Sequence, residues 1–333
     1  MRSLPLIAAG VGIAAIAVLV GYFGTGAVVH ALVTIGLIGF AVVCAIHLVL
    51  MAAMGLAWRA LLPGTRWWVP VWGRFVRDSG SEALPLSQVG GYVIGARALS
   101  LLGIPAALAA ATTIVDVTLE FVAQVVYTAL GLALLVQLKP DSQAAVPLAI
   151  GLGIGVLAAF AFLAMQRRAI PLIDRIARIL GQGWAERTVS GAAALHEALT
   201  ATYRNRAGLT ASFLLHLVCW IVSAAEIWVM LRFAGAPLPF AATLVIESLL
   251  YAARTAAFAI PNAVGVQEGA YILFGAAFGL SPETALALSL MKRARDLVIG
   301  LPTVAVWQIV EGGRLWRRKR KPDRDFAGTR APE

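Results

Sequence analysis

Charged residues are scarce in this sequence, and long apolar runs take their place. Only 13% of the 333 residues are Asp, Glu, Lys or Arg, whereas 60% are hydrophobic. Soluble domains carry about 25% charged residues, because their surface must face water. The composition therefore excludes an ordinary soluble domain. It predicts an all-α polytopic membrane protein, since helices satisfy their own backbone hydrogen bonds in lipid.

Cysteine and catalytic motifs are also nearly absent. Cys44 and Cys219 both lie inside apolar runs, which excludes a disulfide framework. His47 and His216 have no neighbour at metal-ligand spacing, so they are interpreted as helix-packing residues. The sequence contains no HExxH, no nucleophile elbow, no P-loop and no paired Asp-rich motif. We therefore expect no enzyme, no cofactor and no metal site.

The net charge of +10 lies in the segments that flank the apolar runs. This placement is typical of the positive-inside rule and of attraction to anionic lipid headgroups, and it disfavours nucleic acid as a partner. Membrane lipids, polar- or anionic-headed, are the expected partners. A homo-oligomer and a complex with lipid-biosynthesis enzymes both remain open.

Runs of about 20 apolar residues, the length that crosses a bilayer core, recur along the chain. The candidate spans are 6–23, 37–56, 106–138, 146–165, 209–233 and 285–310. The first is expected to be a retained helix rather than a cleaved signal. Segment 166–206 is basic, and its apolar residues recur at helical spacing. It predicts an amphipathic helix on the cytoplasmic surface.

Two further segments are too polar or too broken to be simple spans. Segment 58–102 contains five arginines and several interfacial tryptophans, and segment 240–280 is interrupted by Pro261, Asn262 and Gly265. A Pro-Asn-Ala-Val-Gly run at mid-depth survives only if it is buried in protein or lines water. We therefore favour six spans plus two re-entrant hairpins. The alternative is eight full spans, with each half of 240–280 crossing.

The basic residues also predict the orientation. Arg2, segment 58–100, segment 166–206 and the tail hold one, five, seven and eight of the 27 lysines and arginines. The opposite loops hold only Lys139 and Arg232. Both termini are therefore expected in the cytoplasm of a bacterium, with the chain in the inner membrane. Residues 1–312 form one integral membrane domain, and 313–333 a basic, disordered tail.

Two parts of the chain resemble one another. Gly90 and Gly91 precede a helix that carries Asp116 and Glu120, and the broken run 261–265 precedes one that carries Arg293. By the charge count the two units begin on opposite sides of the membrane. Such a pattern is typical of an inverted repeat with its site at the midplane. The alternative is two ordinary loop–helix junctions in a Gly-rich membrane protein. Gly90 and Gly91 could let a backbone turn approach a ligand closely, and they are predicted structural hinges together with Pro261, Asn262 and Gly265.

The charges inside the apolar helices are the candidate functional residues. Lys292, Arg293, Arg295 and Asp296 lie about two turns inside the last span, where cations need water, carboxylates or a phosphate. The alternative is that the span begins later and the cluster snorkels at the interface. The remaining residues 297–310 would then cover only about 21 Å, which is short for a core of about 30 Å.

Asp116 and Glu120 share one helix face at i, i+4 and have no cation on their own helix. The basic cluster of the last span is their predicted partner, face to face near mid-membrane. Arg97 and Arg254 could complete a phosphate site, since guanidinium groups bind phosphate bidentately. Three more carboxylates are either proton carriers or ion-pair partners: Glu226, Glu247 and Glu268.

Four motifs carry a resemblance to a known family. They are Gln88–Gly91, 115–120, 260–270 and 290–296. They resemble the flippase-like membrane family that includes the transmembrane domain of lysylphosphatidylglycerol synthase, and within it the HpnL group associated with hopanoid biosynthesis. The resemblance implies movement of a polar-headed lipid between leaflets, through a charged cavity closed by re-entrant helices. The residues that match are Gly90, Gly91, Asp116, Glu120, Pro261, Glu268, Arg293 and Asp296.

The sequence thus favours a lipid flippase or transporter, with a headgroup held by the basic cluster. No aminoacyl-transfer domain follows the basic tail, so lipid synthesis is not expected. The alternative function is a membrane enzyme or accessory subunit in lipid or hopanoid modification, such as a glycolipid transferase.

Overall fold

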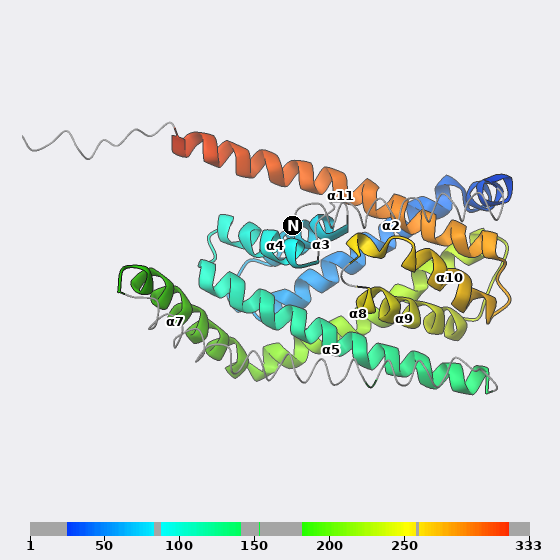
Figure 1. Ribbon diagram of the computed structural model, residues 1–333, viewed down its shortest axis with the longest axis horizontal. Helices are drawn as coiled ribbons and strands as arrows, with labels where there is room; N and C mark the ends of the chain where they lie inside the picture. The colour runs from blue at the N-terminus through cyan, green and yellow to red at the C-terminus, as the bar shows by residue number, and fades with distance from the viewer. Residues whose placement is uncertain (1–24, 83–87, 141–152, 154–181, 258–259, 320–333) are drawn as a thin grey trace, which may run out of the picture.

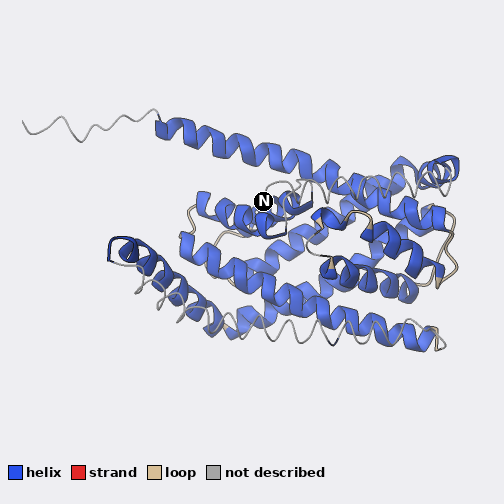
Figure 2. Cartoon of the chain, in the orientation of Figure 1, coloured by secondary structure: helices blue, strands red, loops and turns tan. Residues whose placement is uncertain are grey.

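The computed structural model describes residues 25–82, 88–140, 153, 182–257 and 260–319 (Figure 1). Within these residues every regular element is helical, as predicted: nine α-helices and one short 3-10 turn (Figure 2). Three helices are long and apolar enough to cross a membrane: α2 (Thr25–Ala60), α5 (Ala106–Leu138) and α8 (Arg206–Phe233). They confirm the predicted helices at 37–56, 106–138 and 209–233. The predicted spans 6–23 and 146–165 lie outside the described residues.

The polar segment after α2 forms a pair of short helices, α3 (Trp68–Glu82) and α4 (Gln88–Leu101). Glycines let the two helices approach closely, since a Cβ on Gly91 would lie 2.6 Å from the Arg77 carbonyl oxygen. The prediction of a ligand-binding turn at Gly90 and Gly91 is therefore wrong. Both residues lie in helix α4, and Gly91 faces another helix.

The broken segment 240–280 forms a second pair. Helix α9 (Phe240–Ala256) leads through the 3-10 turn η1 (Pro261–Ala263) into α10 (Val266–Ala276). The break requires left-handed backbone at Asn262 (φ 51°) and at Gly265 (φ 87°), which caps α10. At about 1.5 Å per residue, α9 reaches about 26 Å and α10 about 17 Å, and neither matches a core of about 30 Å. The arms pack through Ile246, Leu250 and Tyr271, so the segment is a helical hairpin.

The two hairpins point toward each other from opposite ends of the bundle. In Figure 1, α4 lies left of centre with α3 near the middle, α9 and α10 lie in the right half, and the helices that follow them, α5 and α11 (Pro282–Lys319), run in opposite directions. The ends of the hairpins touch in the middle, where the Asn262 amide donates a hydrogen bond to the Glu82 carbonyl oxygen at 2.9 Å. The two hairpins are therefore opposed within the bundle, whereas the inverted repeat across a membrane stays a prediction.

Helix α11 differs from the prediction at its far end. It continues through Lys319, so residues 313–319 are helical rather than disordered. Arg, Leu, Lys and Trp in this stretch are compatible with a helix, and no proline follows Pro302 within it. The rest of the predicted tail lies outside the described residues. Helix α7 (Gln182–Arg204) agrees with a helix in segment 166–206, whereas that segment's apolar stripe before residue 182 is not described.

Candidate functional site

A cluster of five charged residues joins α3 to α5. Arg77 donates to Asp116 at 2.7 Å and to Glu120 at 2.6 Å, and Arg74 reaches both oxygens of Glu120 at 2.7 and 2.9 Å. Asp78 accepts from both arginines. The guanidinium of Arg77 also lies over the rings of Trp58 and Tyr92. All these contacts lie in the interior, where a charge without a partner would be very costly.

A second set of ion pairs joins α9 and α10 to α11. Lys292 donates to Glu247 at 2.7 Å, and both side chains are fully buried. The Tyr271 hydroxyl donates to the same carboxylate. Arg293 donates to Glu268 at 2.6 and 3.1 Å, and Glu268 also accepts from the backbone of Gly265. Each cation of α11 in this set is therefore neutralised by a carboxylate of the α9–α10 hairpin.

A third chain of contacts crosses from α11 to α8 and α2. Arg295 donates to Glu226 and, at 2.6 Å, to Asp296. Glu226 also lies 2.8 Å from Nδ1 of His47. A carboxylate can only accept here, so Nδ1 of His47 carries the proton and Nε2 is directed elsewhere.

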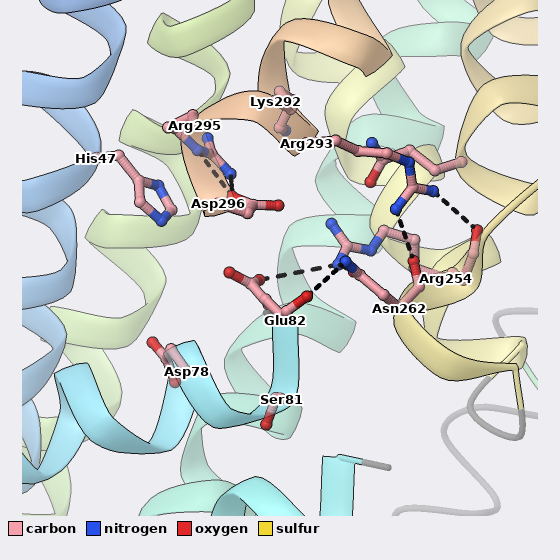
Figure 3. A network of polar contacts seen from close by, with 12 residues as sticks. His47, Asp78, Ser81, Glu82, Arg254, Asn262, Lys292, Arg293, Arg295 and Asp296 are labelled. Atoms are coloured by element: carbon pink, nitrogen blue, oxygen red, sulfur yellow. Dashed lines mark hydrogen bonds and ion pairs between the residues drawn. The ribbon is translucent and has the colours of Figure 1, made fainter. Parts of the chain in front are cut away.

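The ends of the two hairpins meet beside this chain, in a group that we call the tip junction: Glu82, Arg254 and Asn262 (Figure 3). Arg254 donates to the Asn262 side chain at 3.1 Å, and it lies 3.8 Å from the Glu82 carboxylate. Figure 3 shows Asp296 and His47 above and beside Glu82. One ligand-type atom of each of these three residues lies within 4.8 Å of the others.

The predicted partner of Asp116 and Glu120 is wrong. They pair with Arg74 and Arg77 of α3, and not with the basic cluster of α11. The reason is geometric: α3 places its arginines beside Asp116 and Glu120, whereas Lys292 and Arg293 of α11 face the carboxylates Glu247 and Glu268 of α9 and α10. Lys292 is fully buried and Arg295 is 1% exposed, so both side chains are enclosed by protein, whereas the point at which the span of α11 begins stays a prediction.

Two other predictions need correction. Arg97 does not belong to the interior: its side chain is 48% exposed and pairs with Glu311 at 2.9 Å. Helix α4 turns Gly91 and Gly95 toward α3, and this places Arg97 on another face. The histidines are more than packing residues, since His47 contacts Glu226 and His216 contacts Asp116 at 3.0 Å.

Most of the remaining predicted residues lie at or next to the tip junction. Arg254 and Asn262 belong to it, Glu268, Arg293 and Gly265 lie next to it in α10 and α11, and Pro261 begins η1. Glu226, Glu247 and Glu268 each take part in an ion pair. The ion-pair interpretation of these three carboxylates therefore agrees with the structure.

Sequence reasoning missed the four charged residues of α3 that matter most: Arg74, Arg77, Asp78 and Glu82. Their spacing contained a signal, because Arg74, Asp78 and Glu82 recur every four residues on one helix face. Polar residues on one face of a membrane-buried segment must find partners in protein. The tryptophans of this segment predict an interfacial position and its arginines predict the orientation, but neither pattern identifies the ion-pair partners.

In both His–carboxylate groups, arginines lie against the carboxylates that a metal ion would use. Asp116, Glu120 and His216 bring ligand atoms within 4.8 Å of one another, but Arg74 and Arg77 already bind both carboxylates. Beside His47, Arg295 binds Asp296 and Arg254 faces Glu82. A metal ion would have to displace or face these guanidinium groups.

The ion pairs between each hairpin and the long helix after it have opposite polarity. Arg74 and Arg77 of α3 pair with carboxylates of α5, whereas Glu247 of α9 and Glu268 of α10 pair with cations of α11.

Opposed helical hairpins that meet at an ion-paired interior define a multi-pass helical membrane protein. The chain belongs to the family described as the lysylphosphatidylglycerol synthase TM region, whose model matches residues 6–302. The family points to a membrane protein in lipid-related processes. Neither the curated proteins nor the solved structures contain a match to this chain.

Proposed function

We propose that this protein moves a polar- or anionic-headed lipid between the leaflets of a bacterial inner membrane, without changing it chemically, with both termini in the cytoplasm. The observation that carries the proposal is the tip junction, where two opposed hairpins meet in the interior beside buried charges. Broken helices at the interface of opposed repeats are where transporters bind their substrates. The HpnL-like motifs support a hopanoid-related lipid as the cargo.

Arg254 is the residue that we assign to the headgroup. Lys292, Arg293 and Arg295 each donate to a carboxylate within hydrogen-bond distance. Arg254 instead has a neutral amide at 3.1 Å and a carboxylate at 3.8 Å. A phosphate oxygen could therefore approach its guanidinium with less competition than at the other three cations.

Opposite charges that pair within each unit also suit alternating access. Each hairpin can stay attached to its own long helix through Arg77–Asp116 or Lys292–Glu247, while the contacts between the tips open and close. The charged groups then remain neutralised in every state, which avoids the cost of an isolated charge in lipid.

The proposal is tested with purified protein in vesicles that contain fluorescent short-chain phosphatidylglycerol or phosphatidylethanolamine, using a membrane-impermeant quencher to follow exposure. Arg254→Gln should reduce the rate of lipid movement at least tenfold. The matched control Arg97→Gln, an exposed arginine, should leave it within twofold. Equal rates for both variants, or no movement of either lipid by the wild type, would contradict the proposal.

The competing function, lipid modification by an enzyme or its accessory subunit, predicts a different result in cells. Lipid extracts from cells with and without the protein should contain the same lipid species if the protein only moves a lipid. A species that disappears without the protein would favour modification instead.

A further inference from the structure

Glu82 stands out among the buried carboxylates because it is the least well paired. Its carboxylate makes no hydrogen bond to a described residue, and its nearest described cation is Arg254 at 3.8 Å. By contrast, Glu120, Glu226, Glu247, Glu268 and Asp296 each accept from an arginine or lysine at hydrogen-bond distance. The Glu82 side chain is 23% exposed, so water can reach it.

The surroundings of Glu82 make its charge costly. Asp296 of α11 offers a carboxylate oxygen within 4.8 Å, and Figure 3 shows its unpaired oxygen directed to the space above Glu82. His47 of α2 offers one ring nitrogen to the same group, and its Nδ1 lies 2.8 Å from Glu226. The two carboxylates of Glu82 and Asp296 thus lie close together, and like charges at this distance repel strongly in a medium of low dielectric.

Among the described residues, positive groups face Glu82 from three helices, and His47 of α2 is one of them when it is protonated. Arg254 of α9 approaches it at the tip junction, and Arg295 of α11 is committed to Asp296 and Glu226. On its own helix, Asp78 lies one turn earlier and is bound by Arg74 and Arg77. Asn262 of η1 contacts the Glu82 backbone rather than its side chain.

We propose that Glu82 is a proton-binding site. Its carboxylate either attracts Arg254 as an anion or takes a proton from water and becomes neutral. The ionised carboxylate attracts Arg254 and holds the two hairpins together. The neutral acid no longer attracts Arg254 and no longer repels Asp296, so the tip junction loosens. The site couples protonation to the relative position of the hairpins. This coupling acts on transport only if the proposed function is right, but the proton site itself does not depend on it.

The experiment measures the distance between the hairpins rather than lipid movement. Spin labels are placed at Val93→Cys in α4 and Leu273→Cys in α10, both exposed, after Cys44→Ala and Cys219→Ala. Double electron–electron resonance in lipid nanodiscs is recorded from mildly acidic to mildly alkaline pH. The distance distribution of the wild type should shift with pH, and Glu82→Gln should keep the acidic distribution throughout.

Two variants make the result specific. Glu82→Asp retains a carboxylate and should restore the pH dependence, whereas Glu283→Gln, the same substitution in the first turn of α11, should behave as the wild type. A wild-type distribution that ignores pH, or a shift that persists in Glu82→Gln, overturns the proposal. A shift that follows added zinc or a chelator rather than pH also overturns it, since the ligand would be a metal ion.

The outcome is separable from the proposed function. A pH-dependent shift without any lipid movement would remove the transport proposal and leave the proton site intact. Lipid movement without a pH-dependent shift would remove the proton site and leave the transport proposal intact.

Discussion

Lys292 and Glu247 illustrate how single charged residues persist inside this protein. Both side chains are completely buried, and 2.7 Å separates Nζ from the carboxylate oxygen. Tyr271 donates to the same carboxylate, and the rings of Tyr251 and Tyr271 lie within 6 Å of the ammonium group. Each member of the pair is stabilised by the other and by the neighbouring tyrosines, and not by solvent. Loss of one member therefore leaves a buried charge without its counterion.

Replacing one member of this pair should therefore destabilise the protein. Lys292→Met is expected to cost roughly 3–5 kcal/mol, the range for breaking a buried ion pair, and Lys292→Met with Glu247→Gln should recover most of that loss. Thermal unfolding in detergent measures both. Arg97→Met, at an exposed pair, should cost about 1 kcal/mol or less. A single Lys292→Met variant as stable as Arg97→Met would refute the ion-pair interpretation.

Helix pairs in this fold depend on glycines at particular contacts. A Cβ on Gly91 would meet the Arg77 carbonyl oxygen at 2.6 Å and the Ser81 side chain, whereas one on Gly269 would meet nothing within 4 Å. The α3–α4 contact therefore has no room for a side chain at Gly91, although α10 has room at Gly269.

Gly91→Ala should push α4 away from α3 and cost roughly 1–3 kcal/mol, as overpacking does. Gly269→Ala, also in a helix, should be neutral or stabilising by up to about 1 kcal/mol. The comparison uses melting temperatures of the two variants in the same detergent. Similar melting temperatures would mean that the close approach of α3 and α4 is not required.

The break between α9 and α10 is the element on which the second hairpin depends. Gly265 has φ 87°, and its backbone donates to Glu268 at 2.7 Å, while Glu268 pairs with Arg293. The conformation of one residue thus positions a carboxylate for an arginine on the next helix.

Gly265→Ala should strain this break by roughly 1–3 kcal/mol, because left-handed backbone is unfavourable for a residue with a Cβ. It should also reduce lipid movement more than Gly269→Ala does, since it displaces the hairpin end. The vesicle assay and thermal unfolding together check this. A variant with normal stability and normal lipid movement would contradict the role given to the break.

The whole molecule is organised by the opposition of its two hairpins. The loop between α2 and α3 and the loop between α10 and α11 lie at opposite ends of the bundle, since the hairpins point toward each other (Figure 1). If the bundle crosses the membrane along its helices, these loops face opposite compartments.

Single cysteines can test this arrangement. After Cys44→Ala and Cys219→Ala, a membrane-impermeant maleimide should label Thr65→Cys only from the cytoplasmic side and Ser281→Cys only from the other side. Labelling of intact spheroplasts and of inverted vesicles provides the measurement. Labelling of both positions from the same side would exclude opposed hairpins across the membrane.

The sequence alone determined the class of protein and most of its long helices. Apolar length and the scarcity of charge predict α2, α5 and α8, because burial in lipid imposes these properties on each segment separately. Pro261, Asn262 and Gly265 likewise mark the break between α9 and α10, since local backbone preference decides it.

Only the tertiary structure decided which charges meet. Asp116 and Arg77 are 39 residues apart and Lys292 and Glu247 are 45 apart, and nothing in their local sequence selects these partners. Any buried cation satisfies a buried carboxylate by charge alone, so the packing of the helices in the tertiary structure makes the choice. The same packing leaves Glu82 and Arg254 at the junction of the two units, where neither has a full partner.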